Sequence, residues 1–249
     1  STALWVYIYR RRSFTFLALA MFFPTVIAVG IHVYRGSLVH FISFLLLDPQ
    51  WTTVYWSILA SLIATSMVSI CCLMNYLIGW RRFNSNRSTI GSIHEHNRQL
   101  ICGWVRAMGE EIGWRCYLLP GLLVYFRPFI AFSISGLAWG LYHVPVMILL
   151  TYCQQYKVQY PVRTIAVQCT SCWISAFVYG WIGIQCRYSM IPPTMIHFVW
   201  NQLNPLLLGS IYTNTAGWMV GEQWKINGEG LMGCFVCSIA AVVVVLQFS

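Results

Sequence analysis

Two adjacent glutamates, Glu110 and Glu111, lie inside a long apolar run of the sequence. A charge in apolar surroundings is costly unless it is paired, so ionisable residues in such a run indicate a functional site. If the run is a helix, Glu111 and Arg115 share one face in the order that favours an ion pair. Glu110 points about 100° away and could pair with Arg106. Two ion pairs that only neutralise the helix are the alternative interpretation.

Two later apolar runs each contain a second polar pair with the same spacing. Trp139 precedes His143 by four residues, and His197 precedes Asn201 by four residues. On a helix each pair occupies a single face. Taken singly, a buried histidine is often a packing residue, and a polar pair can simply hold neighbouring helices together by hydrogen bonds.

The three runs together supply carboxylates, an imidazole, and an imidazole with an amide. Hydrolysis of a peptide bond needs this set: a base that activates water, and donors for the oxyanion that develops. Glycines spaced four apart overlap two of the runs, Gly109 with Gly113 and Gly136 with Gly140. Small residues at this spacing let helices approach closely. They predict that the helix of the glutamates packs against the helix of His143.

The elements that position these groups must be membrane helices. Hydrophobic residues make up 58% of the 249 residues and charged residues only 8%, whereas soluble domains carry about 25% charged residues. The short alternating segments of a membrane β-barrel are not seen in the sequence. Because backbone groups in lipid must bond internally, we predict an all-α, polytopic transmembrane helix bundle.

Apolar windows predict about seven spans and a single transmembrane domain over residues 1–249, with the catalytic motifs within 110–201. Pro24 should kink the first span. A further segment, 38–47, is too short to span and is predicted to be re-entrant or interfacial. Residues 81–99 and 214–230 should be polar connections. The predicted spans are 14–34, 51–80, 100–125, 129–152, 164–184, 190–208 and 231–248.

The net charge is +9, and arginines gather in short connections between the apolar runs, at positions 10–12 and 81–87. This pattern is typical of cytoplasmic loops that face anionic lipid headgroups. No basic patch alternates with aromatic residues, so nucleic acid is excluded as a partner. The expected surroundings are the lipid bilayer, with the protein a multi-pass membrane protein.

Other protease chemistries fit the sequence less well. His143, His197 and a glutamate could form a zinc site, but the HExxH motif is absent. A serine protease of the GxSxG type is excluded because that motif is missing, and an aspartyl dyad is excluded because Asp48 is the only aspartate. The ten cysteines include two CxxC pairs, which we interpret as buried packing residues. We therefore expect no metal ion.

The three motifs, taken in order, resemble those of the type II CAAX prenyl endopeptidases and bacteriocin-processing enzymes, the CPBP or Abi family of intramembrane glutamic proteases. That family carries EExxxR, (F/W)xxxH and HxxxN on three membrane helices. Each motif alone is weak, but all three in this order on apolar runs are specific. The matching residues of this chain are Glu110-Glu111-xxx-Arg115, Trp139-xxx-His143 and His197-xxx-Asn201.

The resemblance implies the catalytic roles. Glu110 and His143 would activate the water that attacks the scissile carbonyl, and His197 and Asn201 would form the oxyanion hole. No cofactor is implied. The substrate would be a peptide or a prenylated protein, with removal of the C-terminal tripeptide of a CAAX protein as the favoured reaction. The location would be the endoplasmic reticulum in a eukaryote and the plasma membrane in a bacterium.

The resemblance also implies supporting residues. Glu111 and Arg115 would pair and hold their helix, and Trp139 stands where the family often has phenylalanine, which we interpret as a change in packing and not in chemistry. Two alternatives stay open. One is a non-enzymatic membrane protein, such as a retired protease that acts as a scaffold or complex subunit. The other is a zinc-dependent variant of the protease.

Overall fold

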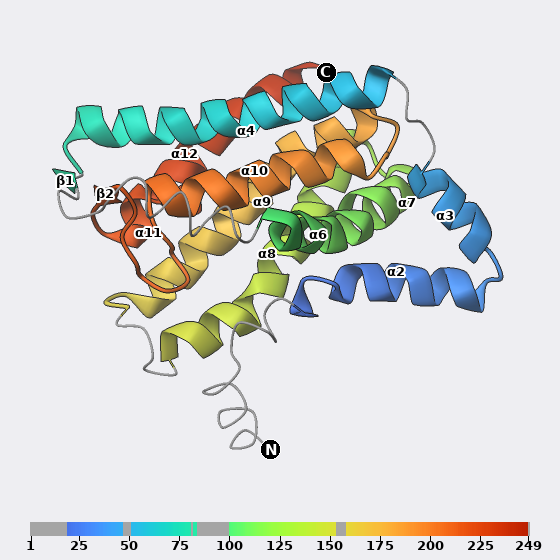
Figure 1. Cartoon of the computed structure of the whole chain (residues 1–249), viewed down its shortest axis with the longest axis horizontal. Coiled ribbons are helices and arrows are strands. Elements are labelled where there is room, and N and C mark those ends of the chain that lie inside the picture. Colours follow the sequence, from blue (N-terminus) through green and yellow to red (C-terminus); the bar gives the residue numbers. More distant parts are fainter. Residues whose placement is uncertain (1–18, 47–50, 81, 84–99, 153–157, 249) are drawn as a thin grey trace.

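The computed structural model describes residues 19–46, 51–80, 82–83, 100–152 and 158–248, and its helices pack side by side as a bundle (Figure 1). The predicted all-α class is confirmed. Within these ranges the only strands are β1 (Arg82–Phe83) and β2 (Met219–Val220), which pair antiparallel. The helices are α2 (Phe23–Tyr34), α3 (Leu38–Leu46), α4 (Trp51–Ile78), α6 (Leu100–Glu111), η1 (Ile112–Leu118), α7 (Leu119–Leu123), α8 (Pro128–Tyr152), α9 (Pro161–Gln185), α10 (Ile191–Leu207), α11 (Gln223–Ile226) and α12 (Leu231–Leu246).

Four helical segments in the described ranges are long and apolar enough to cross a bilayer, together with the shorter apolar helix α2. The expected count of about seven spans therefore differs from the structure. The segment 100–125 divides into three helical pieces that contain four charged side chains, and α10 has only 17 residues. The four segments are Trp51–Ile78, Pro128–Leu150, Pro161–Gln185 and Gln223–Leu246.

The outer faces of these helices are apolar and exposed. On α4, for example, Ile58, Leu62 and Leu77 are each more than half exposed, whereas Ala60 and Ala64 on the inner face are fully buried. In water such a surface would be unfavourable, but lipid tails solvate it. The protein is therefore an integral membrane protein, and the bilayer is its immediate partner.

Pro24 begins a helix and does not kink one. It stands in the first turn of α2, where its missing N–H has no intrahelical partner to lose, and a turn at Met21 and Phe22 precedes it. The first part of the predicted span, up to residue 18, lies outside the described residues. The short segment after it is a nine-residue helix, α3, which is too short to span; its re-entrant or interfacial placement stays a prediction.

The helix of the glutamates changes its winding directly after them. Glu110 and Glu111 end the regular helix α6, and the chain continues as a π-helix, η1, which includes Arg115. π-helical turns are rare and occur often at functional sites. The predicted regular helix is therefore interrupted at the motif itself.

The glycines were predicted to bring the helix of the glutamates against the helix of His143. The two helices do meet, since Trp139 of α8 bonds to Glu110, but these glycines do not form the contact. A Cβ on Gly113 would overlap Pro24, and one on Gly140 would lie 2.6 Å from the carbonyl oxygen of Cys169. Gly113 thus admits the start of α2, and Gly140 admits α9. The spacing correctly indicates close approach but does not specify which helix approaches.

We predict that Gly140→Ala destabilises the protein, because the new methyl group meets backbone atoms that cannot move aside. The expected loss is about 1–3 kcal/mol, measured as a lower midpoint of thermal unfolding in detergent. Gly121→Ala in α7 is the matched control, since no atom of the surrounding residues lies within 4 Å of the place its methyl group would take. Equal midpoints for the two variants would contradict the close packing of α8 on α9.

Candidate active site

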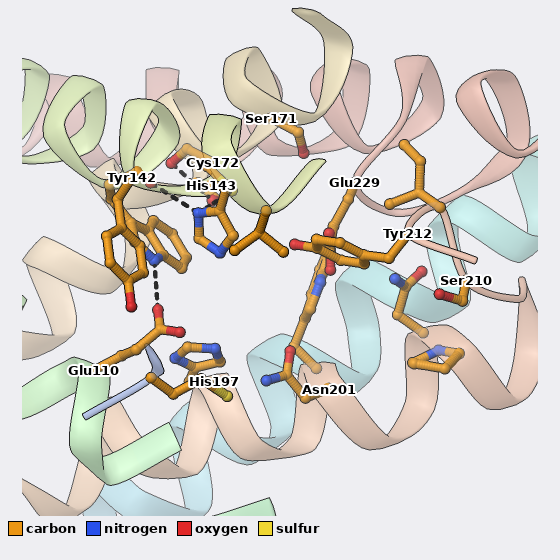
Figure 2. Close-up of a pocket in the computed structure, with 18 of the residues that line it drawn as sticks. Glu110, Tyr142, His143, Ser171, Cys172, His197, Asn201, Ser210, Tyr212 and Glu229 are labelled. Carbon is orange, nitrogen blue, oxygen red and sulfur yellow. Dashed lines mark hydrogen bonds between the residues drawn. The ribbon is translucent and has the colours of Figure 1, made fainter. Parts of the chain in front are cut away.

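A cavity of about 340 Å³ opens between α8, α9, α10 and the segment after α10. All four residues predicted to be catalytic line it: Glu110, His143, His197 and Asn201. Figure 2 shows them around one space, although they come from three helices far apart in the sequence. Its volume falls within the usual range for sites of small ligands, roughly 300–1,000 Å³.

The carboxylate of Glu110 is held by a hydrogen bond from another helix. The indole Nε1 of Trp139 donates to Glu110 Oε2 over 2.8 Å, and Glu110 is only 2% exposed. The ion pairs found in the described part of the chain do not include Glu110 with Arg106. Trp139 therefore contributes a hydrogen bond that phenylalanine could not make. The interpretation of this exchange as packing alone is wrong.

His143 has a defined orientation and proton position. Its Nδ1 lies 2.8 Å from the carbonyl oxygen of Trp139, one helical turn earlier. A carbonyl oxygen can only accept, so Nδ1 carries the proton and donates. In the neutral ring, Nε2 is then the unprotonated nitrogen and can accept a proton. The ring lines the same cavity as Glu110, so two proton acceptors serve one space.

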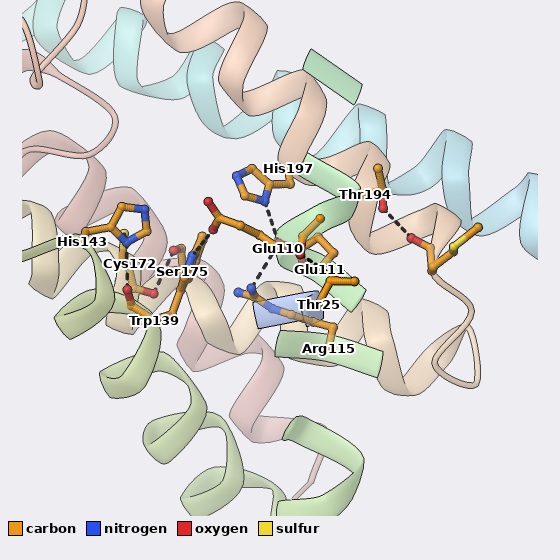
Figure 3. Close-up of polar contacts among 12 residues, drawn as sticks. Thr25, Glu110, Glu111, Arg115, Trp139, His143, Cys172, Ser175, Thr194 and His197 are labelled. Atoms are coloured by element: carbon orange, nitrogen blue, oxygen red, sulfur yellow. Dashed lines mark hydrogen bonds and ion pairs between the residues drawn. The ribbon is translucent and has the colours of Figure 1, made fainter. Parts of the chain in front are cut away.

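Glu111 joins two helices through one oxygen atom. Its Oε1 accepts from Arg115 over 3.1 Å and from His197 Nδ1 over 2.6 Å (Figure 3). All three side chains are buried, with Glu111 and Arg115 no more than 1% exposed. The predicted Glu111–Arg115 pair is thus present, and His197 of α10 is a third member that the sequence did not predict.

The guanidinium of Arg115 also contacts aromatic rings. It lies 4.2 Å from the ring centre of Trp139 and 4.9 Å from that of Tyr179. A cation above an aromatic face is stabilised by the negative potential of that face. Arg115 therefore balances the charge of Glu111 on one side and supports the Glu110 donor, Trp139, on the other.

His197 and Asn201 lie one turn apart on α10 and face the cavity. With Nδ1 of His197 donating to Glu111, its Nε2 points away from that bond. The adjacent carboxylate favours the doubly protonated imidazolium, in which Nε2 also carries a hydrogen. The Asn201 amide supplies a second donor. Two donors side by side are what an oxyanion requires.

One acidic residue of the cavity was missed. Glu229 lines the same space, but the sequence placed it in the polar connection 214–230 without a role. A signal was present, because the chain has only six acidic residues and this one lies between two glycines directly before the last apolar run. Tyr212, from the segment after α10, lines the cavity beside it.

Two of the four CxxC cysteines bond to backbone carbonyl oxygens of neighbouring helices, whereas Cys172 lines the cavity beside His143. The thiol of Cys169 donates to the carbonyl oxygen of Gly140 over 3.2 Å, and that of Cys234 donates to Val167 over 3.5 Å. Within the described residues, no three histidine, cysteine or acidic side chains form a group arranged for a metal ion.

Replacement of Arg115 by Met should strongly destabilise the protein, because it removes the permanently charged cation of the buried network and leaves Glu111 with His197 alone. Removing one partner of a buried pair costs about 3–5 kcal/mol. The double variant Arg115→Met with Glu111→Gln should recover much of that loss. Thermal unfolding in detergent measures both, and a double variant less stable than the single one would contradict the pairing.

The three motifs lie in a segment that matches a known family of proteins. Residues 98–203 match the family model described as type II CAAX prenyl endopeptidase Rce1-like. A comparison with curated proteins found no match. The matched segment contains all seven motif residues, whereas Tyr212 and Glu229 lie beyond its end. The central segment of this chain is therefore similar to the family that its motifs predicted, the Rce1-like type II CAAX prenyl endopeptidases.

Proposed function

We propose that this chain is an intramembrane endopeptidase that hydrolyses a peptide bond with a water activated by Glu110 and His143. The observation that carries the proposal is the arrangement of the cavity. Two fixed proton acceptors and two hydrogen-bond donors, contributed by three helices, line the same space. The match to an Rce1-like family model over residues 98–203 supports the same activity.

In the proposed reaction, a water between Glu110 and His143 gives one proton to these acceptors. The resulting hydroxide attacks the carbonyl carbon of the scissile bond. His197 and Asn201 donate hydrogen bonds to the negative oxygen of the tetrahedral intermediate. The proton then passes to the leaving nitrogen as the carbon–nitrogen bond breaks, which restores the acceptors and releases a carboxylic acid and an amine.

The surroundings of Glu110 suit this role. Its hydrogen bond to Trp139 fixes the carboxylate, and the apolar bundle excludes bulk water from much of its surface. Preorganised groups in such a setting do not need to rearrange as charge develops. Glu111 is unsuited to accept the proton, because it is not among the residues that line the cavity and its Oε1 is engaged by Arg115 and His197.

The favoured substrate is a prenylated C-terminal CAAX peptide, from which the last three residues would be removed. The family match supports it, and so does the cavity, which has mostly apolar walls and lies in a bundle that faces lipid. A membrane-inserted prenyl chain would bring its peptide to the bundle. The membrane would be the endoplasmic reticulum in a eukaryotic cell and the plasma membrane in a bacterium.

The proposal predicts that Glu110→Gln and His143→Ala each lower kcat/KM by about a hundredfold or more, because each removes a proton acceptor. Purified protein in lipid nanodiscs would be assayed with a fluorogenic farnesylated CAAX peptide. Glu222→Gln is the matched control. It should retain activity, because Glu222 is exposed. Thermal unfolding should confirm that all three variants are folded.

The same assay separates the alternatives. Activity that survives a strong chelator supports the glutamate mechanism, whereas activity lost to the chelator and restored by Zn²⁺ supports the zinc-dependent variant. Folded wild-type protein that cleaves neither prenylated nor unmodified peptides would contradict an enzymatic function and favour a scaffold role.

A smaller effect is expected from Trp139→Phe, which keeps an aromatic ring for Arg115 but removes the indole donor to Glu110. A hydrogen bond to a charged group contributes roughly 1.5–3 kcal/mol, so kcat/KM should fall about tenfold or more. Trp181→Phe is the control, since the Trp181 Nε1 is buried without a hydrogen-bond partner in the described part of the chain. Equal activity of the two variants would show that Trp139 does not orient the carboxylate.

A further inference from the structure

Glu229 places a second carboxylate in the cavity, on the side opposite Glu110. It lies in the short connection between α11 and α12 and lines the cavity with His143 and Asn201. Figure 2 shows its side chain across the space from Glu110 and beside Tyr212. Its Oε2 atom is buried and has no hydrogen-bond partner within the described structure. One acceptor atom of the cavity wall is therefore unused.

Buried amides hold the backbone of Glu229 in place. Its N–H donates to Asn227 Oδ1 over 2.9 Å, and the same oxygen accepts from Asn204 Nδ2 over 2.9 Å. Asn204 Oδ1 in turn accepts from the N–H of Gly228 over 2.9 Å. Because Asn204 is on α10, three residues after Asn201, this network fixes Glu229 relative to the proposed oxyanion donors.

The connection is also too tightly packed to relax. A Cβ on Gly228 would lie 2.8 Å from Asn204 Oδ1, and one on Gly233 would overlap the carbonyl oxygen of Gly228. The hydroxyl of Ser171, on α9, donates to that same carbonyl oxygen over 3.2 Å. These contacts fix the backbone that carries the Glu229 side chain.

Among the residues that the structure describes, no permanently charged cation lies beside the carboxylate. Its hydrogen-bond partners Tyr212 and Gln168 are neutral, and the other groups that act on it are the imidazoles of His143 and His197. Gln168 and Tyr212 also bond to each other over 2.9 Å. The ion pairs among the described residues use Glu111 and Glu222, and none includes Glu229. A buried carboxylate without a cation is costly, so a ligand cation would be favoured there.

We propose that Glu229 forms a cation-binding subsite of the cavity, which accepts a protonated amine or guanidinium from a basic side chain of the peptide substrate. Glu229 lines the same cavity as Glu110 and His143, so the basic side chain would belong to a residue close to the scissile bond. This inference rests on the proposed peptidase function and adds a substrate preference to it.

The test uses peptides that differ only by lysine or norleucine, with the exchange made in turn at each of three positions on either side of the scissile bond. At one position, wild-type protein in nanodiscs should cleave the lysine peptide with a kcat/KM about tenfold higher or more, as expected for a charge-assisted hydrogen bond. Glu229→Gln should remove this ratio by lowering cleavage of the lysine peptide, while the norleucine peptide measures any loss that is not specific to the charge. Glu222→Gln should keep the ratio.

A binding measurement makes the test independent of cleavage. In the Glu110→Gln background, the lysine peptide should raise the thermal unfolding midpoint more than the norleucine peptide, and adding Glu229→Gln should abolish the difference. If no peptide is cleaved but this difference is found, the peptidase function fails and the subsite stands. Cleavage without any lysine preference would overturn the subsite alone. An equal loss of rate for both peptides in Glu229→Gln would also overturn it, since Glu229 would then act by positioning the site.

Discussion

The burial of the Glu111 carboxylate is the constraint on which the rest of the site depends. A single oxygen of this group, inside an apolar bundle, accepts from a guanidinium on its own helical segment and from an imidazole on α10. Removing Glu111 would leave a guanidinium and an imidazole side by side without the acid, and removing Arg115 would take away the one permanent cation, in a medium of low dielectric. The network therefore fixes the distance between the motif helix and α10. It also sets the proton arrangement of His197, whose second nitrogen is left to face the cavity.

The same network reaches α8 through an aromatic side chain. The ring of Trp139 faces the Arg115 guanidinium, and its indole N–H donates to Glu110. Its carbonyl oxygen accepts from His143 and orients that ring. One residue thus contacts the structural ion pair and both proposed proton acceptors. The regular helix ends at the two glutamates and continues as a π-helix that includes Arg115. The residues that neutralise Glu111 therefore pack against the residue that orients Glu110 and His143.

Contacts within one helical turn could be predicted from the sequence. Contacts between residues distant in the sequence could not. The ion pair of Glu111 with Arg115 needs only one helical turn, so the sequence predicted it. The indole donor to Glu110 is 29 residues away, and no periodicity indicates such a contact.

The glycines correctly indicated close packing. Their partners, α2 and α9, could not be predicted, because a small-residue pattern does not identify the opposing helix. Pro24 was misread since a proline at a helix start and one at a kink look alike in an apolar run. Glu229 was missed because a single acid in a glycine-rich connection resembles a solvated loop.

The amide network around Asn227 bears on how this site could be inherited. The family match ends at residue 203, and Asn204, the next residue, bonds to Asn227 and Gly228. The helix that presents His197 and Asn201 is thus locked to a segment more than twenty residues beyond the matched region. Recombination that exchanged the last helix and its preceding turn between relatives would separate Asn204 from its partners while every motif residue stayed in place. The cooperative unit of this site therefore extends to Gly230 at least, and sequence change in the two parts should be correlated.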